Sequence, residues 1–234
     1  MNQPVLEVKL AEGESSVALD FGIEAGAAAI LSSGSNPVLD ELLERISGLE
    51  GLAEDDVLLA GGSLVRCRER VLLGRLEALG YASAEGGLIA NLRVWENLLL
   101  PRRARLGPVP ESTAEVEKRI IEAFAQAGIE EQRTVGLMPQ VPDRLSALER
   151  IVCALVRCHL AGFRLLVCDR IFDRLDEGRT RRVAALVDWL GRQHEGSAML
   201  VLRHSTRPVE NSFGLRAWSP VNCIQLEEKS WLAS

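Results

Sequence analysis

Hydrophobic and polar positions alternate at the start of the chain and then give way to apolar runs and helical spacings. The alternation over 5–10 and over 16–23, with Glu12-Gly13-Glu14 between, predicts an antiparallel hairpin. Ala27 to Leu31 is a continuous apolar run, which indicates a buried strand. From Val38 to Ile46 apolar residues recur every three or four positions, as on one face of a helix. The opening part is therefore predicted to contain a hairpin, a buried strand, a loop and a helix.

Helical and strand patterns alternate through the rest of the chain. Helical spacing occupies 112–127, 145–160 and 179–193, and apolar runs typical of buried strands occupy 165–168 and 197–202. Strands that alternate with helices imply a parallel sheet covered on both faces. The stretch from Trp95 to Pro110 is rich in charge, proline and glycine, and with the helix after it predicts an inserted helical subdomain.

Composition narrows the class of protein. The chain has 234 residues, 47% of them hydrophobic, which is enough for a large buried core. Its 27 basic and 33 acidic residues are mixed along the sequence and give a net charge of -6, which excludes nucleic acid as the main partner. Five cysteines without metal-ligand spacing favour a reducing compartment, and Cys153, Cys158 and Cys168 are interpreted as apolar core residues. No signal peptide or spanning helix is predicted, so we expect a cytoplasmic protein.

Six short segments follow one another at characteristic spacings: 30–49, 57–61, 88–101, 145–149, 173–176 and the single residue His204. Together they resemble the ATP-binding cassette (ABC) ATPases, the motor subunits of ABC transporters, over nearly the whole chain. The resemblance implies an α/β fold, a RecA-like P-loop NTPase core of the ABC type with an antiparallel β-subdomain and an inserted α-helical subdomain. The chain would be one domain, 1–234, with the core at about 1–87 and 150–234 and the helical subdomain at about 88–149.

The loop between the buried strand and the first helix departs from a working phosphate loop. Such a loop needs glycines whose N–H groups surround the phosphates, a lysine, and a hydroxyl for magnesium. The resemblance places a vestigial nucleotide site at Gly34, Ser35 and Asn36, but Gly34 is the single glycine of this loop and no lysine or arginine is near it. Pro37 and Leu39 are further departures from the pattern.

The helix that follows this loop has its own start signals. Asn36 suits the cap position and Pro37 the first helical position. Asp40 and Glu41 bring negative charge to the first turns, where it interacts favourably with the helix dipole. We therefore expect this helix to be stable without a bound phosphate.

The apolar run 165–168 ends in Asp169, which the resemblance identifies as the magnesium-site aspartate. Arg170 stands where the family has its catalytic glutamate, and a guanidinium that stays protonated cannot accept a proton from water. Ala84 stands at the position of the glutamine that senses magnesium. Two interpretations of Arg170 remain: a charge network with Asp169, Asp173 or Asp176, which we favour, or a phosphate contact.

The segment 145–149 lies where the family carries its signature motif, which completes the nucleotide site of a facing cassette. Ser146 is retained, but Ala147 and Leu148 replace glycines, and Leu148 adds bulk where close approach is needed. The alternative role of Ser146 is a helix cap, with Glu149 at the third position of a capping box.

The three histidines carry little predicted chemistry. His204 matches the family's switch histidine and is retained with Asp169, but without a lysine or glutamate beside it we interpret it as structural. His159 and His194 fall in predicted helices without convergent partners, and no function is assigned to them.

The favoured function is a degenerate cassette, a pseudo-ATPase with a structural or regulatory role in a membrane transport complex; the alternative is a subunit that binds or weakly hydrolyses ATP. No catalytic residue, cofactor or metal is assigned, and ATP with magnesium belongs to the alternative. The expected partners are a membrane permease and a second cassette, identical or different, which would hold the chain on the inner face of the membrane. The strings Glu96–Pro101 and Leu137–Pro139 resemble cassettes of MCE-type (Mla-type) lipid-trafficking systems.

Overall fold

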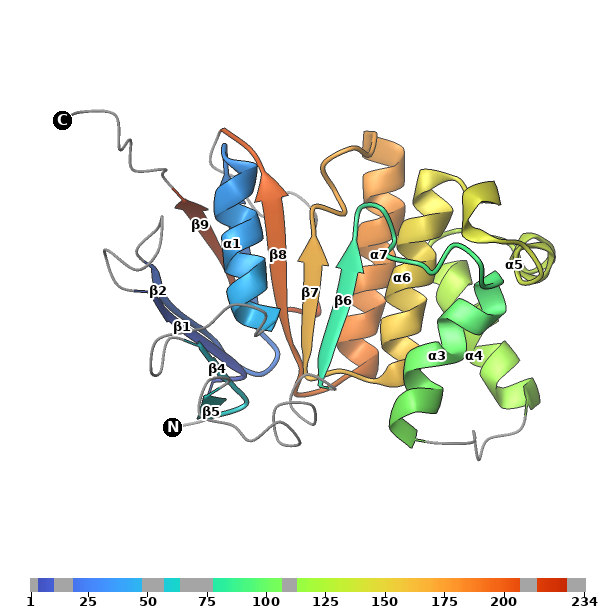
Figure 1. Cartoon of the computed structure of the whole chain (residues 1–234), viewed down its shortest axis with the longest axis horizontal. Helices are drawn as coiled ribbons and strands as arrows, with labels where there is room; N and C mark the ends of the chain where they lie inside the picture. Colours follow the sequence, from blue (N-terminus) through green and yellow to red (C-terminus); the bar gives the residue numbers. More distant parts are fainter. Residues whose placement is uncertain are drawn as a thin grey trace.

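A five-stranded parallel sheet forms the centre of the protein. The computed structural model describes residues 4–10, 19–47, 57–63, 78–106, 113–206 and 214–226. The strands pair in the order β6-β7-β8-β3-β9, and Figure 1 shows β6, β7 and β8 side by side. Their bounds are β3 (Ala28–Ser33), β6 (Leu79–Ser83), β7 (Leu165–Asp169), β8 (Ala198–His204) and β9 (Val221–Leu226). β3, β7 and β8 coincide with the three predicted buried strands.

Alternate residues of each central strand pack into different cores. In β7, Leu165 and Val167 belong to one buried cluster, whereas Leu166 and Cys168 belong to the other. Because successive side chains of a strand point to opposite faces, both faces of the sheet must be covered. This explains why the strands read as continuous apolar runs, and it confirms the predicted sheet.

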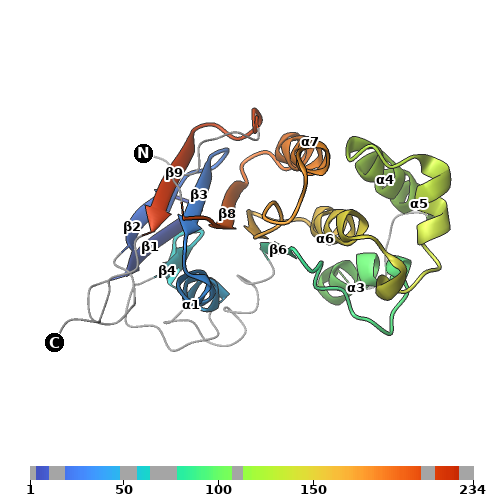
Figure 2. The same ribbon diagram turned by 90° about the horizontal axis from the view of Figure 1, so that it is seen from above.

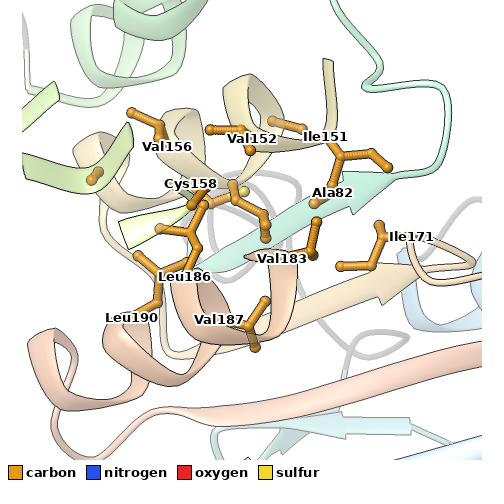
Figure 3. Close-up of a cluster of buried hydrophobic side chains, with 14 of the residues drawn as sticks. Ala82, Ile151, Val152, Val156, Cys158, Ile171, Val183, Leu186, Val187 and Leu190 are labelled. Atoms are coloured by element: carbon orange, nitrogen blue, oxygen red, sulfur yellow. The ribbon is translucent and has the colours of Figure 1, made fainter. Parts of the chain in front are cut away.

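Two different layers cover the two faces. Helices α6 (Ala147–Ala161) and α7 (Glu177–Gln193) cover one face, and Figure 3 shows their apolar side chains meeting over the strands. Helix α1 (Asn36–Ser47) covers the other face together with a four-stranded antiparallel sheet, β2-β1-β4-β5. The bounds in that sheet are β1 (Leu6–Leu10), β2 (Leu19–Ile23), β4 (Val57–Leu59) and β5 (Gly62–Ser63).

The predicted hairpin is present in the antiparallel sheet. β1 pairs with β2 in a register that places Leu6 opposite Ile23 and Leu10 opposite Leu19. The predicted turn at Glu12-Gly13-Glu14 and the start of the second strand at Ser16 lie outside the described residues. The hairpin prediction is therefore confirmed over its described part.

A group of shorter helices lies on the side of α6 that faces away from the sheet (Figures 1 and 2). It consists of α3 (Val94–Leu106), α4 (Thr113–Gln126), α5 (Glu131–Leu137) and a 3₁₀ turn, Pro142–Arg144. α3 continues through Pro101 although proline removes a backbone donor. The next residue, buried Arg102, donates to the carbonyl of Leu160 in α6, which ties this half of α3 to the core. The boundaries of the helical subdomain, about 88–149, stay a prediction.

The described part of the chain contains no helix with both the length and the hydropathy that a bilayer crossing requires. Three of the cysteines, Cys153, Cys158 and Cys168, are buried as predicted. Burial raises the pKa of the Cys153 thiol to about 12 and that of Cys158 to about 11. These thiols therefore behave as small apolar side chains at neutral pH.

His159 and His194 are in contact, so the prediction that they lack convergent partners was wrong. His159 Nδ1 lies 3.0 Å from His194 Nε2, and Arg119 Nη2 lies 3.5 Å from His159 Nε2. The three side chains join α4, α6 and the end of α7. Since Arg119 can only donate, His159 accepts at Nε2 and donates from Nδ1 to His194. The sequence positions are far apart, which is why the pair was missed.

Both imidazoles are held neutral. Burial, the charge of Arg119 and then His194 lower the pKa of His159 to about 3, and burial and Arg119 lower the pKa of His194 to about 4. In the unfolded chain both groups titrate near 6.5. Between these values the unfolded state binds more protons than the folded state, so stability falls as the pH falls below 6.5.

We expect denaturant unfolding to show this loss, comparing pH 7 with pH 5. A variant with both His159 and His194 replaced by glutamine keeps all the carboxylates of the wild type but loses the two depressed imidazoles. Its free energy of unfolding should therefore fall less between the two pH values than that of the wild type. Equal falls in the two proteins would show that the pair does not contribute to the pH dependence.

Candidate functional site

The predicted site residues gather where the parallel strands end. The register places Ser83 of β6 opposite Asp169 of β7, Asp169 opposite Leu202 of β8, and Ser33 of β3 opposite His204. These carboxyl ends share one edge of the sheet, and α1 begins just beyond β3. A cavity of about 400 Å³ lies there, lined by Asn36, Ser83, Ala84, Glu85, Asp169, Arg170, Asp173, Arg174 and His204.

Arg170 crosses this edge from β7 to α1. Its Nε donates to Asp169 Oδ1 at 2.8 Å and its Nη2 to Asp169 Oδ2 at 3.3 Å. The same Nη2 donates to Asp40 Oδ1 at 2.7 Å, and Nη1 donates to Asn36 Oδ1 at 3.3 Å. Partial burial opposes the charge, but the hydrogen bonds and charges of Asp169 and Asp40 outweigh it and raise the pKa of the guanidinium. The site therefore contains a permanent cation that is part of the chain.

The partners of Arg170 are only partly those predicted. Asp169 is confirmed, but Asp173 instead accepts from Arg203 Nε at 3.0 Å and from the backbone N–H of His204 at 2.8 Å. Asp176 caps α7 by accepting from the N–H of Arg179 at 2.8 Å. The Asp173 carboxylate is therefore satisfied by the end of β8, and the Asp176 carboxylate by the first turn of α7.

Asp40 is the partner that was not predicted. The first turn of α1, residues 36–39, contains no acidic residue. The prediction that Asp40 and Glu41 place negative charge in the first turns, next to the helix dipole, is therefore corrected. Asp40 lies in the second turn, where it faces Arg170 from 130 positions away in the sequence. The carboxylate near the start of α1 therefore binds a positively charged guanidinium, whereas a phosphate at this position would be negatively charged.

Asp169 has both carboxylate oxygens engaged. The residue is 5% exposed, Tyr81 donates from its hydroxyl to Oδ2 at 2.8 Å, and Arg170 donates to both oxygens. Burial and the hydrogen bond to Asp169 raise the pKa of the Tyr81 phenol. Tyr81 precedes Ser83 by two residues on β6, so it lies on the same face as the partner of Asp169 in the register. The Tyr81–Asp169 contact was not predicted, because it depends on the pairing of β6 with β7, which the sequence alone does not reveal.

The loop before α1 is closed by contacts within the chain. The backbone N–H of Ser35 donates to Ser33 Oγ at 3.0 Å, and a Cβ added at Gly34 would lie 3.1 Å from Thr206 Cγ2. Helix α1 begins at Asn36, one residue earlier than predicted, and Pro37 lies in its first turn, where a missing N–H costs no hydrogen bond. Leu39 is a buried core residue.

Ala84 and His204 line the cavity but add little polar chemistry. Ala84 has only a methyl side chain, and its N–H donates to the carbonyl of Asp169 at 3.0 Å. The His204 side chain is exposed, and its backbone is fixed by Asp173. At the mouth, Arg174 and Glu85 form an exposed pair at 3.4 Å.

Ser146 and Leu148 do not reach this cavity; they line another, of about 360 Å³, with Arg133, Arg179 and Arg182 among its other residues. Ser146 and Glu149 form the predicted capping box: the Glu149 N–H donates to Ser146 Oγ at 3.3 Å, and the Ser146 N–H donates to Glu149 Oε2 at 2.8 Å. Burial acts to raise the pKa of Glu149, but the hydrogen bonds from Ser146 and Arg133 outweigh it and lower the pKa. Leu148 is 6% exposed and packs in the core. The capping interpretation of Ser146 is confirmed.

The residues present do not fit ATP with magnesium. A magnesium ion needs free carboxylate oxygens, and both oxygens of Asp169 already accept from Tyr81 and Arg170. A triphosphate needs cationic groups and free N–H groups at the loop, yet Arg170 is bound to two carboxylates and the Ser35 N–H to Ser33. The polar groups at this edge of the sheet instead satisfy one another.

Comparison with known sequences finds ABC import proteins, although no protein-family model matches the chain. The methionine import ATP-binding protein MetN of Clostridioides difficile is 25% identical over 74% of this chain and 51% of its own length. The molybdenum import ATP-binding protein ModC of Pseudomonas aeruginosa is 30% identical over 72% of this chain and 43% of its own. The chain thus spans about half the length of these two relatives. The thiamine import ATP-binding protein ThiQ of Vibrio vulnificus is 25% identical over 80% of this chain and 74% of its own.

Solved structures show the same fold. The ATP-binding cassette MJ0796, dimeric and bound to ADP and phosphate, matches with a TM-score of 0.68 at 19% identity, over 86% of this chain and 87% of that one. Subunit cbiO1 of Clostridium perfringens, part of the ABC transporter complex cbiONQ, matches with a TM-score of 0.67 at 16% identity, over 87% and 80%. The protein has the α/β fold of the ABC ATPase cassettes, with a parallel sheet, covering helices and an antiparallel sheet.

Replacing Ser146 with alanine should lower the free energy of unfolding by about 1 kcal/mol, because it removes one half of the capping box. We expect the same loss with and without magnesium and ATP, as measured by urea unfolding. Gln126→Ala, at an exposed position of α4, is the control and should stay within about 0.5 kcal/mol of the wild type. A loss that appears only with nucleotide would assign Ser146 to ligand binding instead.

Proposed function

We propose that the protein is a non-hydrolysing cassette, a pseudo-ATPase that serves as a structural or regulatory subunit of an ABC membrane transport complex. The observation that carries this proposal is the bridge from Arg170 to Asp169 and Asp40. It places a guanidinium between the strand end and the helix start, where the resemblance puts magnesium and the attacking water. The import ATP-binding proteins among its sequence relatives support the link with transport.

Hydrolysis by the family mechanism would need a group that accepts a proton from water. Arg170 stays protonated and is held in that state by two carboxylates. Burial and the hydrogen bond that Tyr81 donates to Asp169 raise the pKa of the phenol and keep it protonated. Ala84 offers no polar side-chain atom. Arg170 and Tyr81 therefore stabilise the charge of Asp169, and neither they nor Ala84 can accept a proton from water.

The proposed partners are a membrane permease and a second cassette. The neighbour cbiO1 is described as part of a transporter complex, and MJ0796 as dimeric, which supports both kinds of contact. Two copies of this chain would give two defective sites, so we favour an intact ATPase as the second cassette. The permease would hold the chain at the inner face of the membrane.

An apolar surface on the helical region suits the contact with the permease. Ile89, Trp95 and Val141 are 44%, 37% and 36% exposed, and we call these three residues the apolar face. The Trp95 N–H donates to the carbonyl of Met138 at 3.2 Å, and the Val94 N–H donates to the carbonyl of Gln140 at 2.8 Å, so the start of α3 lies beside 138–141. Exposed large apolar side chains on neighbouring segments are typical of a protein interface.

The loop that carries Ile89 is rigidly held although it has no regular structure. Asn97, 1% exposed, accepts from the Ile89 N–H at 2.7 Å and donates to the carbonyls of Ile89, Leu92 and Arg93 at 3.0 to 3.2 Å. Arg157 of α6 donates to the carbonyl of Gly87 at 2.6 Å. A surface that is ordered before binding loses less conformational entropy when it meets a partner. We infer that the apolar face is preformed for an amphipathic helix of the permease.

The transported substrate is the finer part of the proposal. The relatives described above import methionine, molybdenum and thiamine. The resemblance of 96–101 and 137–139 to MCE-type cassettes proposes lipid instead. Phospholipid that co-purifies with the assembled complex would support lipid trafficking, and a complex free of lipid that binds a small nutrient would contradict it.

We expect no phosphate release from ATP and no stabilisation by magnesium and ATP. A ligand at 100 times its dissociation constant would stabilise the fold by about 2.7 kcal/mol, which is visible as a higher melting temperature. Malachite-green phosphate detection and thermal melting measure the two effects. Asp169→Asn is the matched control: phosphate release that occurs in the wild type and is lost in this variant would establish the alternative, a working ATPase.

Trp95→Ala should weaken the complex with the proposed permease partner by about 2 kcal/mol, roughly 30-fold in Kd. Leu100→Ala is the control, because Leu100 is 43% exposed on the same helix but lies about 140° around it from Trp95. Co-expression and affinity measurement in detergent compare the two variants. Equal losses, or none for Trp95→Ala, would place the contact elsewhere.

A further inference from the structure

Arg170 has a backbone conformation that arginine rarely adopts. Its φ is 54°, in the left-handed region, which disfavours residues with a Cβ. The backbone N–H of Arg170 donates to the carbonyl of Leu202 at 2.9 Å, which fixes this conformation at the end of β7. Local strain of this kind persists where the surrounding contacts compensate for it. The compensating contacts here are those of the guanidinium.

The guanidinium uses all three of its nitrogens, and its contacts lie on two elements. Nε and Nη2 contact Asp169 at the end of β7, while Nη1 and Nη2 contact Asn36 and Asp40 in the first two turns of α1. The arginine side chain is 25% exposed, that of Asp169 is 6% exposed and that of Asp40 is 51% exposed. The bridge is therefore buried at β7 and more exposed at α1.

The negative charges of Asp169 and Asp40 require a cation between the end of β7 and the start of α1. Asp169 and Asp40 both lie within hydrogen-bond distance of the same Nη2 atom, so without Arg170 two carboxylates would face each other across the edge of the sheet. Like charges at such a separation repel, and the repulsion is strongest for the buried carboxylate. Asn36 and Tyr81 supply an amide oxygen and a hydroxyl but no positive charge. Arg170 is the cationic group that offsets both carboxylates.

We propose that Arg170 is a built-in cation, which holds the start of α1 against the end of β7 without any bound ligand. This inference rests on the proposed function, since it explains how a cassette without nucleotide keeps an ordered site. The residues that do not fit ATP with magnesium have a structural role instead. Where a nucleotide would bind and dissociate, the chain has the permanently attached side chain of Arg170. The edge of the sheet then has one arrangement rather than a loaded and an empty one.

Arg170→Gln tests the charge, since glutamine keeps a side-chain amide donor and loses the cation. We expect the melting temperature to fall by at least about 4 °C, and hydrogen exchange to become faster in residues 40–47, whose N–H groups bond within α1, because α1 loses its contact with β7. Arg174→Gln is the control: the exposed pair of Arg174 with Glu85 contributes little, so neither quantity should change. Equal behaviour of the two variants would overturn the proposal.

Arg170→Gly separates strain from bridging, because glycine adopts a positive φ without cost. We expect this variant also to melt below the wild type; a melting temperature at or above the wild-type value would show that strain outweighs the bridge and would overturn the proposal. If an Arg170 variant fails to fold, Asp40→Asn decides, since it removes only the α1 end of the bridge. Faster exchange confined to residues 40–47 of α1 is then expected, and unchanged exchange contradicts the proposal.

All these measurements are made without nucleotide, which keeps the two proposals apart. If magnesium and ATP stabilise the wild type, the proposed pseudo-ATPase fails. The comparison of Arg170→Gln with Arg174→Gln still decides whether Arg170 holds α1 to β7. Conversely, if Arg170→Gln is as stable as Arg174→Gln, the proposal that Arg170 is a built-in cation fails. The proposed absence of hydrolysis is then still decided by the measurement of phosphate release.

Discussion

A carboxylate that is almost fully buried at the end of a strand needs a cation or several hydrogen-bond donors beside it, because an isolated buried charge is costly. Asp169 is such a carboxylate, and Arg170 and Tyr81 together satisfy it. The parallel register sets this requirement: it brings the ends of β3, β6, β7 and β8 to one edge and places α1 directly above them. The groups at this edge can bind an external ligand or one another. In this protein they bind one another.

The same edge determines how the surrounding loops are arranged. Asp173 fixes the end of β8 through Arg203 and the His204 N–H, and Asp176 caps α7. Asp173 therefore ties the loop after β7 to the end of β8, 30 residues further along the chain, and Asp176 has a local partner at the start of α7. Arg170 reaches instead to Asp40 on α1. The loop is thus held to β8 by Asp173, and the bridge from Arg170 joins it to the helix on the other face of the sheet.

The sequence could predict the elements whose signal is local and missed the contacts that depend on pairing. Apolar runs gave β3, β7 and β8, and the Ser146–Glu149 spacing gave the capping box, because each depends on neighbouring residues. The Asp40–Arg170 pair, the Tyr81–Asp169 hydrogen bond and the His159–His194 contact join positions 130, 88 and 35 residues apart. The sequence showed that Ala84, Leu148 and Arg170 depart from the motifs of a working site. The contacts that Arg170 makes could not be predicted, because they depend on the register of β6 with β7 and on the position of α1.

The loop from 84 to 93 connects the charged edge to the apolar face. It begins with the Ala84 N–H on the carbonyl of Asp169, passes the contact of Arg157 with Gly87, and ends with Asn97 around Ile89. A force applied to Ile89 by a partner would therefore reach the strand end that carries Asp169 through a segment fixed at both ends. In a hydrolysing cassette such a connection could pass on a change at the nucleotide site. Under the proposed function, with Arg170 in place of a ligand, the same connection would hold the apolar face in one geometry, as a docking subunit requires.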